Sequence, residues 1–246
     1  MIQRLLGLQR EGGSAVLLTV VEGEGIGSKL LVVEGGETLG DGPPELVAHA
    51  DDLIRGARSR MLELEGRKVF AEVYGPPPRL FVYGAVDTAE ALAAAARQLG
   101  WRTVVADARA KFATPERIPS ADELLVVWPE EAFAQVAPDH ATAIVVLTHD
   151  DKFDLPALEL ALASGAFYIG LIGGRRNQER KRELLREAGV DEEALQRIAG
   201  PCGLDLGAET PAEVALSILS EVLAARNGRA GGSLRGSRQR IHAEAE

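Results

Sequence analysis

Residues 167–176 read Phe-Tyr-Ile-Gly-Leu-Ile-Gly-Gly-Arg-Arg, an apolar run that leads into two glycines and two arginines. The run 167–171 has the length and apolar content of a buried strand, and a charged, helix-like segment follows the arginines. Glycines at such a corner let the backbone approach a ligand closely, and the helix start presents unpaired N–H groups and a positive dipole end. Arginines add permanently charged donors. The sequence therefore predicts an anion site made by Gly173, Gly174, Arg175 and Arg176.

Short apolar runs alternate with helical segments throughout residues 79–226. We expect strands at 80–83, 103–106, 124–127, 143–147 and 167–171. We expect helices at 88–99, 154–163, 178–188, 191–198 and 211–225, with a helical turn from Glu130. Continuous apolar strands are typical of a parallel sheet covered on both faces. The pattern predicts an α/β fold with a Rossmann-like, doubly wound parallel sheet and right-handed crossovers.

The preceding residues predict a smaller α+β domain. Gly-rich turns separate β-like runs at 15–21, 29–34 and 68–74, and apolar residues recur at helical spacing over 44–64. Gly75-Pro76-Pro77-Pro78 marks a boundary, because consecutive prolines form a stiff spacer. The expected organisation is a small domain at 1–75, a Rossmann-like domain at 79–226 and a mobile basic tail at 227–246.

Composition excludes several classes of function. A net charge of -10 over 246 residues argues against sequence-independent nucleic-acid binding, which needs clustered Lys and Arg. The single cysteine, Cys202, excludes an internal disulfide and a cysteine-based zinc site, and it fits a reducing compartment. No long hydrophobic stretch indicates a membrane segment or a leader, so we expect a cytoplasmic protein.

The turn after the first strand of the larger domain, Gly84-Ala85-Val86-Asp87-Thr88-Ala89, lies where a dinucleotide-binding G-x-G-x-x-G would stand. Val86 places a branched side chain where the second glycine lets a backbone approach pyrophosphate, so NAD(P) is the less favoured cofactor. Asp107 ends the second strand near the spacing of an acid that binds a ribose hydroxyl. A turn or helix-capping role for Asp107 is an equally good interpretation.

Thr148-His149-Asp150-Asp151 follows the strand 143–147, at the sheet edge where open α/β folds bind ligands. His149 could carry a proton or donate to a bound anion, with Asp150 orienting its ring. Alternatively, Thr148 or Asp151 caps the next helix and His149 lies on the surface. The acidic and histidine side chains are too few to predict a metal site.

Arg175 and Arg176 also have a structural interpretation, as partners of Glu179 and Glu183 along their helix. We expect one arginine to face the ligand and the other to pair or pack.

Thr210-Pro211-Ala212-Glu213 is a capping box, with Thr210 as N-cap and Glu213 returning to it. Such a cap fixes the preceding loop 203–209 beside the sheet edge, where Asp205 could contact a ligand. Cys202 is expected to be a small core residue rather than a sulfur carrier.

Three motifs together resemble one family. They are T-H-D at 148–150, Y-I-G-x-x-G-x-R-R at 168–176, and P-x-G-L-D-x-G-A-x-T-P-x-E at 201–213. This combination resembles the XdhC/CoxI family, accessory proteins that handle molybdenum cofactor for xanthine dehydrogenase-type molybdenum hydroxylases. The resemblance covers about residues 79–226.

The resemblance implies a carrier that binds molybdenum cofactor (molybdopterin) and passes it to a client molybdenum hydroxylase, with no catalytic residues of its own. It also implies a cysteine desulfurase as a further partner, and a homodimer. The cofactor phosphate would lie near Gly173, Gly174 and Arg175 or Arg176, with Gly84 and residues 148–150 on the other side. An NAD(P)-dependent oxidoreductase and a partner-binding module without cofactor remain the alternatives.

The chain departs from the family pattern in two places. The family usually has G-A-G-H where this chain has Gly84-Ala85-Val86-Asp87. Many members carry one cysteine in a G-G-C-V-E-like segment and another in a C-G-G-like segment before the Rossmann-like domain. Residues 38–47 contain neither cysteine, so the roles of those thiols do not carry over.

Overall fold

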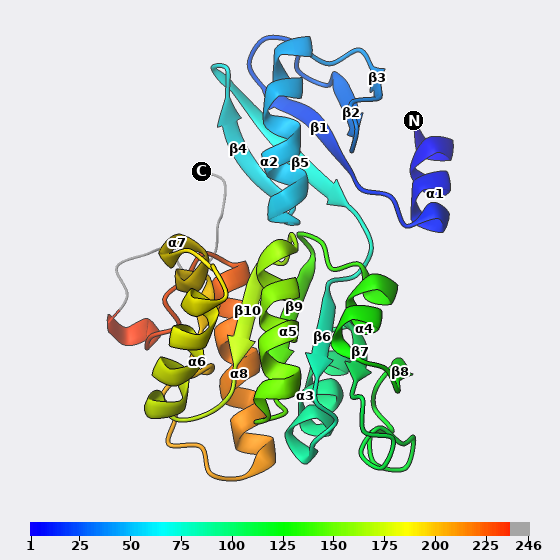
Figure 1. Ribbon diagram of the computed structural model, residues 1–246. Helices are drawn as coiled ribbons and strands as arrows, with labels where there is room; N and C mark the ends of the chain where they lie inside the picture. Colours follow the sequence, from blue (N-terminus) through cyan, green and yellow to red (C-terminus); the bar gives the residue numbers. More distant parts are fainter. Residues whose placement is uncertain (237–246) are drawn as a thin grey trace. The chain divides into compact units, whose positions relative to one another are not determined.

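The computed structural model describes residues 1–236, with compact units at Met1–Pro76 and Pro77–Gly231 (Figure 1). Residues 237–246 of the expected tail lie outside the described residues. The described part of the tail contains one turn of 3-10 helix, η2 (Leu234–Gly236). None of the helices within residues 1–236 combines the length and apolar character needed to cross a membrane.

The unit Pro77–Gly231 contains a six-stranded parallel sheet in the order β11-β10-β9-β6-β7-β8. Its strands are β6 (Arg79–Tyr83), β7 (Arg102–Ala106), β8 (Glu123–Leu125), β9 (Thr142–Val146), β10 (Tyr168–Leu171) and β11 (Ile198–Ala199). The chain runs from β6 to β8 on one side and then from β9 to β11 on the other. The strand order therefore reverses between β6 and β9, as in a doubly wound Rossmann sheet, and the predicted fold class is confirmed.

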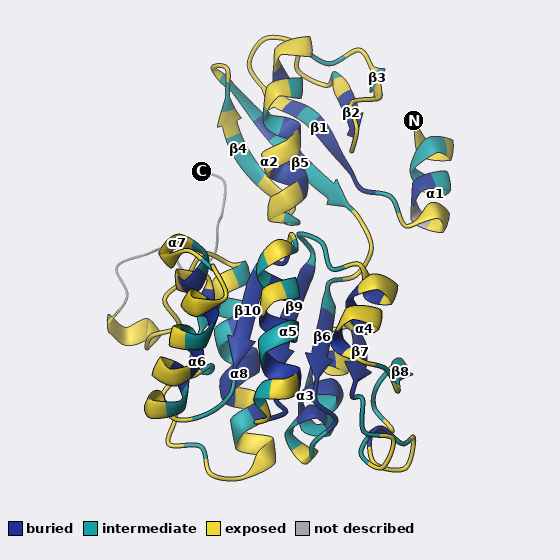
Figure 2. Cartoon of the chain, viewed as in Figure 1, coloured by how far each residue is buried: buried dark blue, intermediate teal, exposed yellow. Residues whose placement is uncertain are grey.

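Helices cover both faces of this sheet. They are α3 (Asp87–Gln98), α4 (Pro129–Val136), α5 (Asp151–Ala163), α6 (Arg175–Glu187), α7 (Glu192–Gln196) and α8 (Pro211–Arg226). Successive residues of β6 alternate between two cores: Leu80 and Val82 pack with α3 and α8, whereas Phe81 and Tyr83 pack with α4 and α5. Figure 2 shows the inner strands of this sheet mainly as buried, the edge strand β8 as intermediate, and the helices as exposed on their outer faces.

Helix starts differ from the expected ones at the carboxyl edge. α5 begins at Asp151 rather than at 154, and α6 begins at Arg175 rather than at 178. The two arginines are therefore the first residues of α6, one turn earlier than predicted. The short edge strand β11 was not predicted, because its two residues carry no periodic signal.

The unit Met1–Pro76 is built on a five-stranded antiparallel sheet in the order β3-β2-β1-β5-β4. Its elements are α1 (Ile2–Glu11), β1 (Ala15–Glu22), β2 (Lys29–Val33), β3 (Thr38–Gly40), η1 (Pro44–His49), α2 (Ala50–Gly56), β4 (Arg60–Leu64) and β5 (Arg67–Tyr74). Val16 and Leu18 face a core shared with α2, whereas Leu17 faces a second core that includes Leu8 of α1. The smaller unit is thus α+β, as predicted.

The helix expected over 44–64 is wrong beyond residue 56. Ala57 adopts a left-handed conformation (φ 47°) and ends α2, and Met61 and Leu62 belong to strand β4. Glu65 and Gly66 both have positive φ and form the turn between β4 and β5. The helical spacing of apolar residues ran across this boundary by coincidence, because a half-buried strand also supplies apolar residues.

Candidate functional site

Loops that follow β6, β9 and β10 meet at the carboxyl edge of the parallel sheet. A methyl group added to Gly84 would lie 2.9 Å from both the Leu147 carbonyl carbon and the Thr148 amide nitrogen. A methyl group added to Gly173 would lie 3.9 Å from Nδ1 of His149. The structure therefore brings Gly84, Thr148, His149 and Gly173 together, at the point where the strand order reverses.

Asp107 directly follows β7, and both of its carboxylate oxygens accept hydrogen bonds from protein donors. One carboxylate oxygen accepts from the amide and Nε of Arg109, and the other accepts from the amide of Ala85 and from Nη2 of Arg109, at 2.8–2.9 Å. Burial opposes ionisation, but these hydrogen bonds and the adjacent guanidinium lower the pKa of Asp107. With about four acceptor positions occupied, the carboxylate has none left for a ribose hydroxyl.

The loop between β9 and α5 presents His149. This residue has a left-handed backbone (φ 61°), which turns the chain outward, and Asp150 caps α5 by accepting from the Lys152 amide at 3.1 Å. The expected orientation of His149 by Asp150 is not among the hydrogen bonds of residues 1–236. Asp150 serves instead as the helix cap, the role for which Thr148 or Asp151 was considered.

Burial and the ammonium group of Lys181 lower the pKa of His149 below its ordinary value of 6.5. An NMR titration of the His149 ring is therefore expected to give a midpoint below 6.5. Because the folded-state pKa is the lower one, this histidine contributes stability above pH 6.5 and the contribution is lost as pH falls through the folded pKa. His149→Gln should remove that component of the pH dependence; a midpoint at or above 6.5 would contradict it.

A buried ion pair lies behind this loop. Lys181 of α6 and Asp154 of α5 are both fully buried; Lys181 donates from Nζ to one carboxylate oxygen of Asp154, and the Thr148 hydroxyl donates to the other. Burial lowers the pKa of Lys181, while Asp151 and Asp150 oppose that shift. The pair joins α5 to α6 and fixes Thr148, the residue before His149.

Lys181 was not predicted as a site residue. On α6 the inward positions are Gln178, Lys181 and Leu185, which are buried at spacings of three and four residues. The helical spacing of Gln178, Lys181 and Leu185 in the sequence would have placed Lys181 on the inner face of the helix.

Gln178 fixes the glycine turn before α6. Its Nε2 donates to the carbonyl oxygens of Leu171 at 3.0 Å and Ile172 at 3.1 Å. Gly173 has φ 118°, a conformation that only glycine adopts without strain. These hydrogen bonds hold the glycine turn from its buried side. The first residues of α6, Arg175 and Arg176, are exposed.

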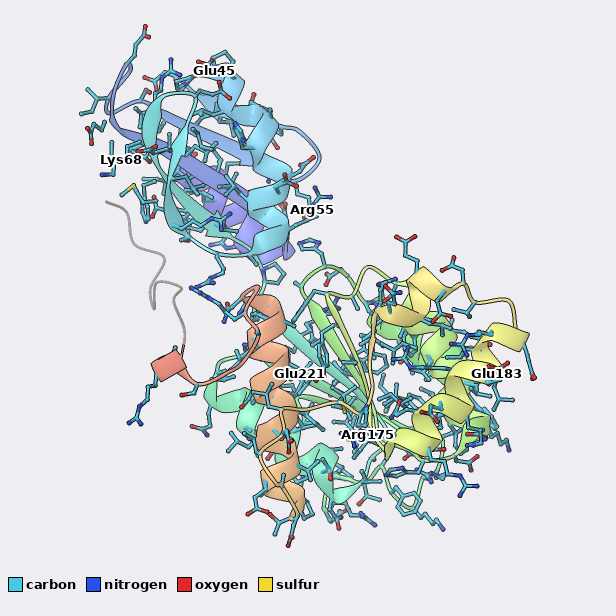
Figure 3. All side chains as sticks on the ribbon, turned by 90° about the vertical axis from the view of Figure 1, so that its left-hand side faces the viewer. Glu45, Arg55, Lys68, Arg175, Glu183 and Glu221 are labelled. Carbon is cyan, nitrogen blue, oxygen red and sulfur yellow. The ribbon has the colours of Figure 1, made fainter. Side chains whose placement is uncertain are left out.

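Arg175 and Arg176 border a cleft of about 830 Å³, lined by Gly174, Arg175, Arg176, Asn177 and Arg180. Figure 3 shows Arg175 at the first turn of α6, with Glu183 further along the same helix. Arg180 pairs with Asp151, and Glu183 pairs with Arg186. Among the described residues, neither Arg175 nor Arg176 has an ion-pair partner, so the expected pairing with Glu179 or Glu183 is absent and both arginines face the cleft.

A family model described as the XdhC Rossmann domain matches residues 80–222. The chain belongs to the XdhC family. The match covers the whole parallel sheet, including every loop of the carboxyl edge described above.

Curated relatives agree with this assignment. The chain is 35% identical over 167 residues to the uncharacterized protein YqeB of Escherichia coli (strain K12), covering 67% of this chain and 30% of that protein. It is 30% identical over 158 residues to a probable xanthine dehydrogenase subunit of Bacillus subtilis (strain 168), covering 64% and 46%. It is 29% identical over 153 residues to the molybdenum cofactor insertion chaperone PaoD of Escherichia coli (strain K12), covering 62% and 42%. The chain thus spans less than half the length of these XdhC relatives.

A solved structure, described as a xanthine dehydrogenase from Bacillus halodurans, shares the fold with a TM-score of 0.69 and 24% identity. The alignment covers 92% of this chain and 66% of that one. At this level of identity the similarity shows that the two chains share a fold.

The loop before α8 carries the third XdhC motif. The capping box at Thr210 and Glu213 is confirmed, with both reciprocal hydrogen bonds present. Asp205 is exposed, and it forms no hydrogen bond or ion pair with another residue of 1–236.

Burial, with the nearby Glu221 carboxylate, raises the pKa of Cys202 to about 12, so this thiol stays protonated at neutral pH. Within residues 1–236, no group of three His, Cys, Asp or Glu side chains is arranged to hold a metal ion.

Proposed function

We propose that this XdhC-family protein is an accessory factor that binds molybdenum cofactor and delivers it to a molybdenum hydroxylase of the xanthine dehydrogenase type. The observation that carries the proposal is the arginine-lined cleft at the start of α6. The guanidinium groups of Arg175 and Arg176, which have no ion-pair partner within residues 1–236, suit the phosphate of the cofactor, and guanidinium–phosphate hydrogen bonds are among the strongest available to a protein.

The surroundings of the cleft support binding in a fixed geometry. Gly174 is the N-cap of α6 and supplies no side-chain cap. The Asn177 amide donates to the Gly174 carbonyl at 2.9 Å, and no hydrogen bond within residues 1–236 uses the amides of Arg175 and Arg176, which stay available to an anion. Gln178 and the Lys181–Asp154 pair hold the glycine turn and the helix from the buried side. Binding therefore needs little rearrangement of the protein, which favours affinity.

The chemistry of the site supports holding the cofactor rather than modifying it. The Cys202 thiol is protonated at neutral pH, and a thiol rather than a thiolate is a poor metal ligand and sulfur acceptor. Lys181 is engaged with Asp154 and is out of solvent. His149, close to Gly173 at the same edge, supplies a ring N–H to an oxygen of the cargo.

Cofactor content tests the proposal. Protein purified from its native host should release a pterin that is detected by its fluorescence after oxidation. Replacing both Arg175 and Arg176 by Ala should lower the bound pterin at least tenfold, because each charge-assisted hydrogen bond contributes about 1.5–3 kcal/mol.

The matched control is Arg186→Ala, which removes an arginine from the same helix where it pairs with Glu183 and Glu192. This variant should keep the wild-type pterin content. Equal pterin content in the control and in the double variant would refute the phosphate site. Copurification of a molybdenum hydroxylase without any pterin would instead favour a partner-binding module.

A further inference from the structure

One of the two tryptophans is exposed beside the candidate site. Trp101 is 4% exposed and packs in the core, whereas the side chain of Trp128 is 46% exposed. Trp128 is the N-cap of α4, three residues after the end of β8. The Tyr83 hydroxyl at the end of β6 donates to the carbonyl oxygen of Val127 at 3.1 Å. This hydrogen bond holds the residue before Trp128 at the carboxyl end of β6, one of the two strands between which the strand order reverses.

A cationic and an aromatic side chain contact the Trp128 ring. Nζ of Lys152 lies 4.7 Å from the indole centroid, and the Phe153 ring lies 5.3 Å from it, both on the first turn of α5. The guanidinium of Arg109 lies 5.5 Å from the Phe153 ring and 4.3 Å from the Phe112 ring. Three loops, which follow β7, β8 and β9, thus contribute to one cluster of flat groups.

The cluster is held in place from below. Asp107 fixes the guanidinium plane of Arg109 by accepting two hydrogen bonds, from Nε and Nη2, and Phe153 is itself buried. Lys152 is exposed and has no ion-pair partner among residues 1–236. Its ammonium group therefore lies over the indole face without a competing carboxylate, and it remains available to ring oxygens of a ligand.

We propose that Trp128, with Lys152 and Arg109, is a stacking subsite for a planar heteroaromatic ring. The exposed Lys152 side chain, which lies over the indole in the structure, moves aside as the ring stacks on that face, and its ammonium then donates to the carbonyl oxygen of the ring. A pterin and a nucleobase share this chemistry. This inference rests on the proposed function, which supplies the ligand. The ring of that ligand would lie at Trp128 and its phosphate at Arg175 and Arg176. The two subsites use different residues.

Tryptophan fluorescence tests the subsite. In Trp101→Phe the emission comes from Trp128 alone, and titration with free pterin, cytidine or adenosine, none of which carries phosphate, should quench it to saturation. Trp128→Phe, which keeps only Trp101, should show no saturable quenching. Should Trp101→Phe fail to fold, the difference between wild type and Trp128→Phe gives the same signal. Saturation by pterin alone assigns the subsite to a pterin, and saturation by a nucleoside assigns it to a nucleobase.

Equilibrium dialysis then measures the contribution of stacking. Trp128→Ala should weaken binding of the quenching ring compound roughly tenfold, the usual effect of removing an aromatic stacking partner. Because these compounds lack phosphate, the result does not depend on the arginine cleft. Absence of quenching by all three, while the wild type still carries cofactor, would overturn the subsite and leave the proposed function standing. Shielding of Trp128 only when a client hydroxylase is added would also overturn it and assign the face to protein docking.

Discussion

Lys181→Met should lower the free energy of unfolding by about 3–5 kcal/mol at pH 7, because it leaves the Asp154 carboxylate buried without its cation. Both side chains are fully buried, so water cannot replace the lost partner. The Thr148 hydroxyl would still donate to Asp154, but one neutral donor compensates a buried charge only in part. Urea denaturation followed by far-UV circular dichroism measures the effect as a shift in midpoint with an unchanged slope.

Two further variants separate the buried pair from its surroundings. Glu192→Ala breaks an exposed ion pair made by another basic residue of α6, and it should leave the urea midpoint close to that of the wild type. The double variant Lys181→Met, Asp154→Leu replaces both charges by apolar groups and should recover most of the lost stability. If Lys181→Met cost no more than Glu192→Ala, the ion pair would not be buried in solution.

The parallel sheet could be predicted from the sequence because its strands are buried on both faces. Runs such as 80–83 and 143–147 are apolar at every position, and helices of clear periodicity separate them. The smaller unit was harder. Strand β4 is exposed or half-buried at every position, so its apolar residues were included in a helix prediction.

The candidate site, too, could be predicted from the sequence only in part. Placement of Gly84, residues 148–150 and Gly173 at one edge follows from topology, since the carboxyl ends of parallel strands lie together. Pairings between side chains of different elements do not follow from local patterns. The Asp107–Arg109 contact is local, and the turn interpretation of Asp107 is consistent with its bond from the Arg109 amide, although the guanidinium contact was not predicted. The Lys181–Asp154 pair depends on the packing of α5 against α6. Trp128 was not predicted as a site residue because β8 is short and half-exposed.

Gly84→Ala should destabilise the protein by about 3 kcal/mol or more and should abolish cofactor retention. Gly84 has φ 116°, where an L-residue is strained by about 1–3 kcal/mol. The added methyl group would also lie 2.9 Å from backbone atoms of Leu147 and Thr148, which cannot move without displacing β9. The loop that carries His149 would be pushed away from the sheet edge, so the effect reaches the site as well as the core.

Gly165→Ala is the matched control, because its methyl group would be 3.5 Å from the nearest atom, an ordinary contact, and Gly165 is exposed. Its unfolding free energy should stay within about 0.5 kcal/mol of the wild type. Thermal denaturation and pterin content of the two variants would be measured side by side. A Gly84→Ala protein as stable as Gly165→Ala would mean that the β6 and β9 loops are not in contact. A stable protein that had lost only its pterin would instead place Gly84 against the ligand, in the role that the dinucleotide fingerprint gives its glycines.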